Sequence, residues 1–127
     1  MQESDARREW ARCRHWIEAA LRHSPGFERI EDVERYIEEG RYQFWPGKRC
    51  AAVTEIAQFA AKRALVLQHA GGDMDELLYD MEPALVAFAR AAGCDAIMGL
   101  GRKGWERVGE KLGYRFAWIA LVKFLRP

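Results

Sequence analysis

Glu55 is the residue whose type and position most directly indicate chemistry. It lies within residues 50–59, CAAVTEIAQF, on one face of an expected strand with Val53 and Ala57. A carboxylate on an otherwise apolar face is costly unless it is paired or faces a cleft. Partial desolvation raises the pKa of a carboxyl group, which suits a general base. Glu55 is therefore a candidate base. The alternative is a salt bridge to a nearby Arg or Lys, or a position at the rim.

His69 is a second candidate, at the end of an expected strand over residues 64–70 and just before Gly71 and Gly72. An imidazole titrates near neutral pH, so His69 could act as a base or contact a phosphate group. A surface or capping position is the alternative. Glu55 and His69 together make up the predicted catalytic set.

A basic turn, Gly-Arg-Lys-Gly at residues 101–104, precedes an expected helix over 103–112. Arg102 and Lys103 could hold an anion through charge and backbone donors, or they could belong to a solvated turn. The wider basic group adds Arg107 and Lys111. The whole chain carries 20 basic and 19 acidic residues, for a net charge of +1, which argues against nucleic acid as a partner.

An aromatic run at residues 42–45 contains Tyr42 and Trp45 and is closed by the turn signal Pro46-Gly47. Exposed aromatic side chains would make a binding surface here. Buried ones would belong to the core. Both interpretations stay open at this point.

The chain must position these residues with a mixture of helices and strands. The period of the apolar residues predicts helices at 4–22 and about 29–39, followed by strands at 42–45, 50–59 and 64–70. Asp73 lies three residues before Glu76 and fits a capping box at the start of the next helical segment. Pro83 within that segment predicts a kink or two abutting helices.

The C-terminal third continues the alternation of strands and helices. We expect a strand at 95–100, the helix at 103–112 with Gly113 as its stop, and a long last strand at 114–125. This last strand is apolar on both faces, so it should be internal or covered on both sides. The predicted order is α-α-β-β-β-α-β-α-β. The predicted class is α+β, in a single domain over residues 1–127.

The composition places limits on the class of protein. Half of the 127 residues are hydrophobic and 31% are charged, as in a globular domain. Cys13, Cys50 and Cys94 lack the spacing of zinc ligands, so we expect no metal and free thiols in a reducing compartment. The polar start is unlike a signal peptide, and no apolar run approaches the ~20 residues of a membrane span. We therefore expect a cytoplasmic location and no membrane partner.

The predicted order resembles that of the GNAT superfamily, the acyl-CoA-dependent N-acyltransferases. The most specific similarity lies in residues 94–114, where Leu112-Gly113-Tyr114 resembles the phrase that ends a helix of this family. The segments QFWPG, AVTEI and GRKGWERV also resemble small phage or prophage members of this fold. The resemblance implies a central mixed, mostly antiparallel sheet flanked by helices. A cleft should open where the strand ending at Ala70 parts from Asp95–Leu100.

The resemblance also implies roles for the candidate residues. The family holds the cofactor pyrophosphate with backbone N–H groups at a helix N-terminus, and the matching segment here is residues 68–73. The implied function is transfer of an acyl group from acetyl-CoA or another acyl-CoA to a small-molecule or protein amine, with Glu55 as base. Tyr42 and Trp45 would lie on the acceptor side. The implied cofactor-binding residues are Gln68, Ala70, Gly71, Gly72 and Arg102.

Three departures from the family pattern favour a different function. Asp73 stands where the cofactor loop has a small residue, and Gly109 stands where these enzymes often have a Tyr as general acid. No strand is visible before the first helix, and the closing hairpin is reduced to one strand. The alternative is a GNAT-shaped module without catalysis that serves interaction or assembly in a phage-derived system. A homo-oligomer or a phage protein would then be its partner.

Overall fold

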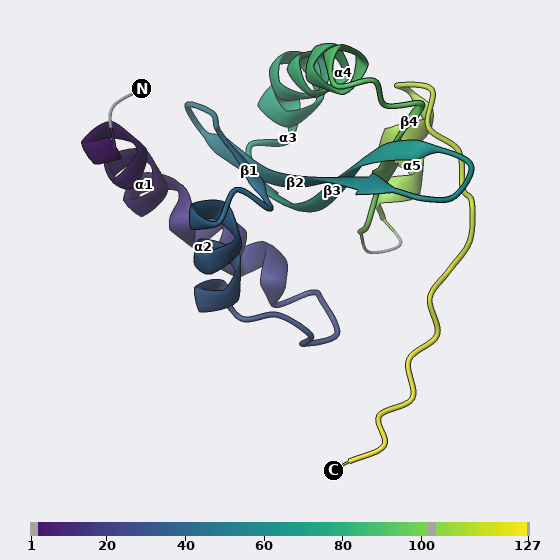
Figure 1. Cartoon of the computed structure of the whole chain (residues 1–127), viewed down its shortest axis with the longest axis horizontal. Helices are drawn as coiled ribbons and strands as arrows, with labels where there is room; N and C mark the ends of the chain where they lie inside the picture. Colours follow the sequence, from purple (N-terminus) through teal and green to yellow (C-terminus); the bar gives the residue numbers. More distant parts are fainter. Residues whose placement is uncertain (1–2, 102–103, 127) are drawn as a thin grey trace.

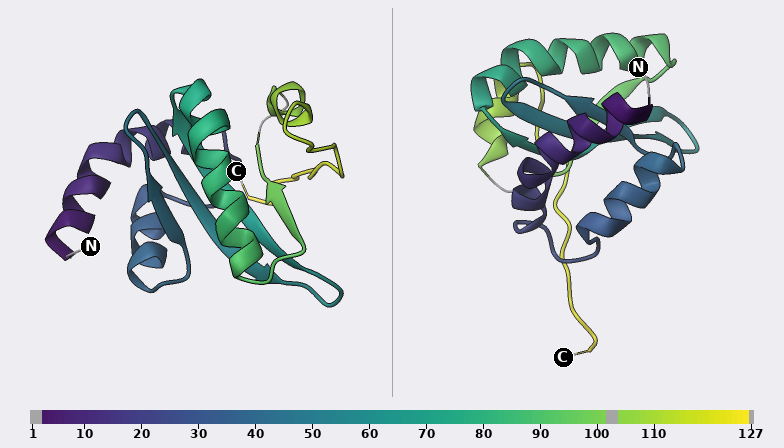
Figure 2. Two further views of the ribbon diagram at one scale, coloured as in Figure 1. Left: turned by 90° about the horizontal axis from the view of Figure 1, so that it is seen from above. Right: turned by 90° about the vertical axis from the view of Figure 1, so that its left-hand side faces the viewer.

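A computed structural model describes residues 3–101 and 104–126 and contains one sheet with helices on both of its faces (Figure 1). Seen from the side, α4 lies on one face, and α1 and α2 lie on the other (Figure 2). The elements are α1 Glu3–Leu21, α2 Ile30–Glu38, β1 Gln43–Pro46, β2 Cys50–Gln58, β3 Arg63–Gly72, α3 Met74–Glu76, the π-helical turn η1 Leu77–Met81, α4 Glu82–Ala91, β4 Ala96–Gly99 and α5 Trp105–Glu110.

The sheet is mixed and mostly antiparallel, as predicted. Its strand order among the described residues is β1-β2-β3-β4. The β1–β2 and β2–β3 pairs are antiparallel, and the β3–β4 pair is parallel. The class is therefore α+β.

Alternation along β2 divides the core into two clusters. Cys50 and Ala52 face α4 and pack with Leu65, Leu77 and Leu85. Ala51 and Val53 face the other way, and their cluster continues into the two N-terminal helices through Cys13, Ile17 and Val33. The period of two that was predicted for residues 50–59 thus decides which helices cover which face.

β3 carries one residue more than β2 at the middle of their ladder. Val53 lies opposite His69 and Thr54 lies opposite Leu67, so Gln68 has no opposite residue and forms a β-bulge. β3 also loses its other neighbour here. It pairs with β4 from Ala64 to Leu67, and the Leu100 N–H donates to the Leu67 carbonyl at 3.2 Å. Residues 68–72 have no β4 partner, so the two strands part at the bulge.

The helical segment after β3 contains a π-helical turn where Pro83 predicts a kink. The Glu82 N–H donates to the carbonyl of Leu77, five residues back, which closes the π-turn. Pro83 then falls in the first turn of α4, where its missing N–H costs little. The π-turn therefore joins α3 to α4 as one continuous segment.

Close packing fixes the two glycines at the end of β3. A Cβ on Gly71 would lie 2.4 Å from the backbone oxygen of Trp16, so α1 crosses β3 there in direct backbone contact. Gly72 has a φ of +104°, and a Cβ on it would lie 2.4 Å from the Arg49 oxygen. Both glycines are thus required by packing and backbone conformation.

A buried carboxylate holds the β1–β2 turn against α3. Glu76, 8% exposed, accepts hydrogen bonds from the N–H groups of Lys48 at 3.2 Å and Arg49 at 2.7 Å. Hydrogen bonds from the Cys50 thiol and from these N–H groups lower the pKa of Glu76. Burial, followed by the contact with Glu76, raises the pKa of the Cys50 thiol to about 12. Glu76 therefore connects two segments that are far apart in the chain.

The C-terminal segment differs from the prediction. Residues 114–126 form no strand and follow an irregular, extended path beyond α5 (Figure 1), along which the Phe124 ring stacks on the Phe27 ring at 6.1 Å. The turn before the segment does match the prediction. Gly113, with a φ of +90°, ends the preceding helical turn, and the Tyr114 N–H donates to the Gly109 carbonyl at 3.0 Å. In the described residues, no helix has the length and apolar character needed to cross a membrane.

Replacing Glu76 tests the contact between the turn and α3. Because the pKa of Glu76 is lowered by folding, its contribution to stability is present above its unfolded pKa of about 4.3 and is lost as the pH falls through the lower, folded value. We expect Glu76→Gln to lower the urea midpoint clearly at pH 7 and by a smaller amount at pH 3. Circular dichroism can measure both midpoints.

Asp75→Asn is the matched control, because Asp75 is an exposed acidic residue in the same turn. It should leave the urea midpoint nearly unchanged at both pH values. An equal loss for the two variants, or a Glu76→Gln loss that does not depend on pH, would contradict the role given to Glu76.

Candidate functional site

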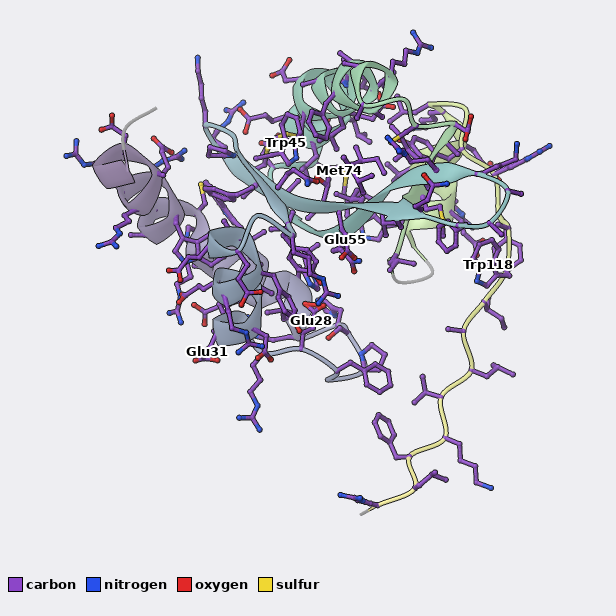
Figure 3. The ribbon with its side chains drawn as sticks, in the orientation of Figure 1. Glu28, Glu31, Trp45, Glu55, Met74 and Trp118 are labelled. Carbon is purple, nitrogen blue, oxygen red and sulfur yellow. The ribbon has the colours of Figure 1, made fainter. Side chains whose placement is uncertain are left out.

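Polar side chains gather on the face of the sheet that α1 and α2 cover. Two of them, Glu28 and Glu55, lie below the sheet in Figure 3, whereas Trp45 lies above it. We call this group the polar cluster; its members are Glu28, Arg41, Tyr42, Glu55, Gln68 and His69. The cluster contains both predicted catalytic residues. It lies at the β3 bulge, where β4 separates from the sheet.

His69 is linked to two residues from other elements. Its Nε2 lies 3.1 Å from Glu28 Oε2, and its side chain is 9% exposed. With Glu28 ionised and the imidazole neutral, Nε2 would donate to Glu28 and Nδ1 would be the acceptor of the ring. The Tyr42 hydroxyl donates to the other oxygen, Oε1, of Glu28. Burial and this contact with a carboxylate both raise the pKa of Tyr42.

Glu55 uses both of its carboxylate oxygens in contacts within the chain. Oε2 accepts from Arg41 Nε at 2.7 Å, and Oε1 accepts from Gln68 Nε2 at 3.1 Å. The Arg41 guanidinium also lies 4.1 Å from the centre of the Tyr36 ring. The ion pair that the sequence left as an alternative for Glu55 is therefore present. Each oxygen of Glu55 already accepts one hydrogen bond, whereas Nδ1 of a neutral His69 ring has no hydrogen bond within the described residues.

Tyr42 and Trp45 lie on opposite faces of the sheet, so they do not form one surface. Tyr42 is buried in the polar cluster. Trp45 donates from Nε1 to Thr54 Oγ1 at 2.9 Å, and its ring centre lies 5.2 Å from that of Phe88. Ala70 packs on the same side as Trp45.

The segment expected to bind the cofactor phosphate is a strand up to Gly72, followed directly by a helix cap. Gly71 and Gly72 pair with Ala51 and Cys50 of β2. Asp73 Oδ1 accepts from the Glu76 N–H at 2.9 Å, as the capping pattern predicts. The Glu76 side chain does not complete the box, because the Asp73 N–H donates to the Arg49 carbonyl instead. Arg102, the last predicted cofactor residue, lies outside the described residues.

Two shallow, open hollows flank the β1–β2 turn. One, of about 530 Å³, is lined by Glu9, Arg12, Pro46, Gly47 and Lys48. The other, of about 480 Å³, is lined by Trp45, Pro46, Gly47, Lys48, Arg49, Glu76, Asp80, Met81 and Ala84. Neither hollow includes a residue of β4 or of the segment 68–72. Within the described residues, no group of three His, Cys, Asp or Glu side chains could hold a metal ion.

Gly109, at the position expected for a general acid, lies beside Tyr114. A Cβ on Gly109 would lie 3.2 Å from the Cβ of Tyr114. The Tyr114 hydroxyl donates to Glu82 Oε1 at 3.3 Å, and burial is the main cause of the raised pKa of Tyr114. Tyr114 therefore acts as a link to α4 in this arrangement.

Sequence reasoning missed two members of the polar cluster. Glu28 lies 41 positions from His69, in the connection between α1 and α2, and no local pattern marks it. Arg41 is 14 positions from Glu55, and only the general expectation that a carboxylate on an apolar face needs a cation points to it.

Several solved structures resemble this chain throughout its length. An aminoglycoside acetyltransferase from an uncultured soil metagenomic sample, solved with sisomicin, has a TM-score of 0.66 at 8% identity, covering 99% of this chain and 93% of that one. Glucosamine-6-phosphate N-acetyltransferase from Arabidopsis thaliana gives 0.60 at 14%, with 99% and 95% covered. An acetyltransferase from Trypanosoma brucei gives 0.61 at 14%, with 98% and 96% covered.

These likenesses identify the fold as that of the GNAT acetyltransferases. The comparison of sequences gives no further assignment, since neither a family model nor a curated protein matches the chain. The fold implied by the Leu-Gly-Tyr phrase and by the order of elements is thus confirmed.

A double-mutant cycle on Tyr42 and Glu28 tests the polar cluster. Tyr42→Phe removes a hydrogen bond to a charged group in a buried position, which should lower the free energy of unfolding by about 1.5–3 kcal/mol. The coupling between Tyr42→Phe and Glu28→Gln should lie at roughly 0.5–3 kcal/mol. Urea unfolding of the four proteins gives this coupling energy. A coupling near zero would mean that the two side chains do not interact in solution.

Proposed function

We propose that this chain is a small acyl-CoA-dependent N-acyltransferase acting on an amine, with His69 as its base. The supporting observation is the position of His69, which lies at the bulge where β3 leaves β4 and keeps Nδ1 as an acceptor. The solved structures of the same fold are described as acetyltransferases that act on aminoglycosides or on glucosamine 6-phosphate. For this chain we propose an amine as the acceptor, without a more specific substrate.

The residues of the chain fit an acyl-CoA in part. From Gln68 to Gly72 the β4-facing edge of β3 has no strand partner in the described residues, so its backbone groups could pair with an extended amide-containing ligand. The fit is weaker for the phosphates, because Asp73 already accepts the Glu76 N–H at the start of α3. We therefore propose that residues 68–72 hold the extended arm and that the helix terminus contributes little.

In this proposal each residue of the polar cluster has a separate task. When bound, an acyl-CoA supplies an activated acyl group in the form of a thioester. His69 takes the proton of the acceptor ammonium on Nδ1, and Glu28 stabilises the resulting imidazolium through Nε2. The Tyr42 hydroxyl orients Glu28. Glu55 acts as a positioning residue, because Arg41 and Gln68 fix its two oxygens.

The second candidate is a GNAT-shaped module without catalysis that serves interaction or assembly. The Asp73 cap, the absence of a hydroxyl at Gly109 and the internal contacts of Glu55 favour it. The phage-derived setting and the phage-protein partner belong to this candidate as predictions, and the cytoplasmic location remains a prediction for either candidate.

Binding of acyl-CoA separates the two candidates. For the enzyme, acetyl-CoA at about 100 times its Kd should stabilise the folded chain by about 2.7 kcal/mol. This raises Tm by roughly 10 °C in a domain of this size. A thermal-shift titration with acetyl-CoA, longer acyl-CoAs and CoA measures the effect, and ATP controls for charge alone. A Tm that stays constant with every CoA compound would remove the enzyme and leave the module.

Replacing His69 tests its role as base. His69→Gln should lower kcat/KM for acetyl transfer to an amine panel by roughly 100-fold or more and should remove the limb of the pH profile that belongs to the base. Release of free thiol reports the rate. His15→Gln is the matched control, because His15 is an exposed histidine on α1. If His69→Gln keeps the wild-type rate and pH profile while His15→Gln behaves the same way, His69 is not the base.

A further inference from the structure

Arg41 lies among three side chains that each attract a positive charge. Its Nε donates to Glu55 Oε2 at 2.7 Å. Its guanidinium lies 4.1 Å from the centre of the Tyr36 ring and 5.7 Å from the centre of the Tyr42 ring. An aromatic face attracts a cation over distances of up to about 6 Å, because the face carries partial negative charge. We call Tyr36, Tyr42 and Glu55 the cation cage, and Arg41 occupies it.

The cation cage is held in shape by contacts that do not involve the side chain of its occupant. Gln68 Nε2 donates to the second oxygen of Glu55 at 3.1 Å. Tyr42 is buried, and its hydroxyl donates to Glu28. The rings of Tyr36 and Tyr42 meet edge to face, with 5.1 Å between their centres. A site that is already shaped loses little conformational freedom on binding, which favours affinity for a ligand.

The end of α2 sets the spacing of the two rings. Gly40 has a φ of +77°, a left-handed conformation that ends the helix. The N–H groups of Arg41 and Tyr42 then both donate to the Tyr36 carbonyl, at 2.9 and 3.0 Å. The backbone therefore holds both rings beside the same cation.

The attachment of Arg41 to the cation cage is weak. Its side chain is 50% exposed. Within the described residues its side chain donates one hydrogen bond, from Nε, whereas a guanidinium can form two parallel bonds with a carboxylate. A half-exposed ion pair of this kind contributes little to stability. A cation of a ligand can therefore replace Arg41 at a small cost in free energy.

The cation cage adjoins the proposed base. The Tyr42 ring faces the cage, and the Tyr42 hydroxyl donates to Glu28, whose other oxygen contacts His69. Glu28 and Glu55 thus place two carboxylates in the polar cluster beside a single arginine, Arg41. Once the arginine is displaced, the two carboxylates match a ligand with two positive charges.

We propose that the cation cage binds a second cationic group of the acceptor in place of Arg41, so that the acceptor is a diamine. One ammonium gives its proton to His69, and the other meets Glu55 Oε2 and the two rings. Gln68 continues to hold the other oxygen of Glu55, so Glu55 keeps its positioning role. This inference rests on the proposed function and specifies the class of substrate for that site.

Methylguanidinium, which carries the head group of arginine, tests the cation cage without acyl-CoA. Arg41→Ala should bind it roughly tenfold more tightly than wild type, because the competing side chain is gone. Titrations followed by NMR of the isotope-labelled chain measure both affinities, and the side-chain amide of Gln68 reports on Glu55. Methylurea, the neutral analogue, should bind neither protein.

Arg35→Ala is the matched control, because Arg35 also lies over the Tyr36 ring, at 5.1 Å, but forms its ion pairs outside the cation cage. It should bind methylguanidinium as weakly as wild type. The double variant Arg41→Ala/Glu55→Gln should lose the gain in affinity, and its NMR spectrum shows whether it is folded. Equal affinity in wild type and Arg41→Ala, or a gain that survives in the double variant, would overturn the cage.

Rates of acetyl transfer test whether the cation cage serves the acceptor. Putrescine should exceed butylamine, the monoamine of equal carbon number, by roughly tenfold in kcat/KM. This ratio should rise in Arg41→Ala and fall towards unity in Glu55→Gln. A wild type without the preference, or a ratio that Glu55→Gln leaves unchanged, would overturn the diamine. A chain whose Tm does not respond to acyl-CoA would remove the proposed function and the diamine with it, whereas the methylguanidinium titration decides the cage in either case.

Discussion

The arrangement of the candidate site depends on a single extra residue in β3. Side chains of a strand alternate between the two faces of a sheet. Leu67 lies on the α4 side, so regular alternation would place residue 69 on the α4 side as well. The bulge at Gln68 breaks the alternation and turns His69 towards α1 and α2, where Glu28 and Tyr42 lie. The side chain of the next residue, Ala70, lies on the α4 side again. Since the bulge coincides with the end of the β3–β4 pairing, one irregularity both orients the histidine and frees the strand edge beside it.

The polar cluster suits acid–base chemistry, whereas the cap of α3 suits stability of the fold. In the cluster, Glu28 leaves an acceptor atom free on His69, which is what acid–base chemistry requires. At the cap, Asp73 and Glu76 satisfy backbone donors with carboxylates, which stabilises the fold at the expense of anion binding. A transferase built in this way would rely on the strand edge more than on the helix terminus. A binding module would keep both features for stability alone.

Periodicity in the sequence was sufficient for much of the fold. The alternation of residues 50–59 identified the two faces of β2, and the Asp73 and Gly113 signals located a helix start and a helix end. The contact of Glu28 with His69 was beyond such reasoning, because it joins positions 41 residues apart without a local pattern. The bulge was also missed, since Gln68 has no unusual chemistry. For residues 114–125, the apolar pattern of a strand was evident from the sequence, but the pairing partner of a strand is set by tertiary structure.

The π-turn at Leu77–Met81 allows one helical segment to serve two partners that face different directions. An α-helix advances by about 100° per residue, so one inserted residue rotates everything after it by that angle relative to everything before it. Ahead of the turn, Glu76 reaches the β1–β2 connection; beyond it, Leu85 and Ala89 rest on the sheet. Deleting one residue of the π-turn would restore a regular α-helix. Either the contact of Glu76 with the β1–β2 turn or the packing of Leu85 and Ala89 on the sheet would then be lost. The π-turn therefore sets the angle between the two contacts. The number of residues in this helical segment is constrained even where the identity of its side chains is not.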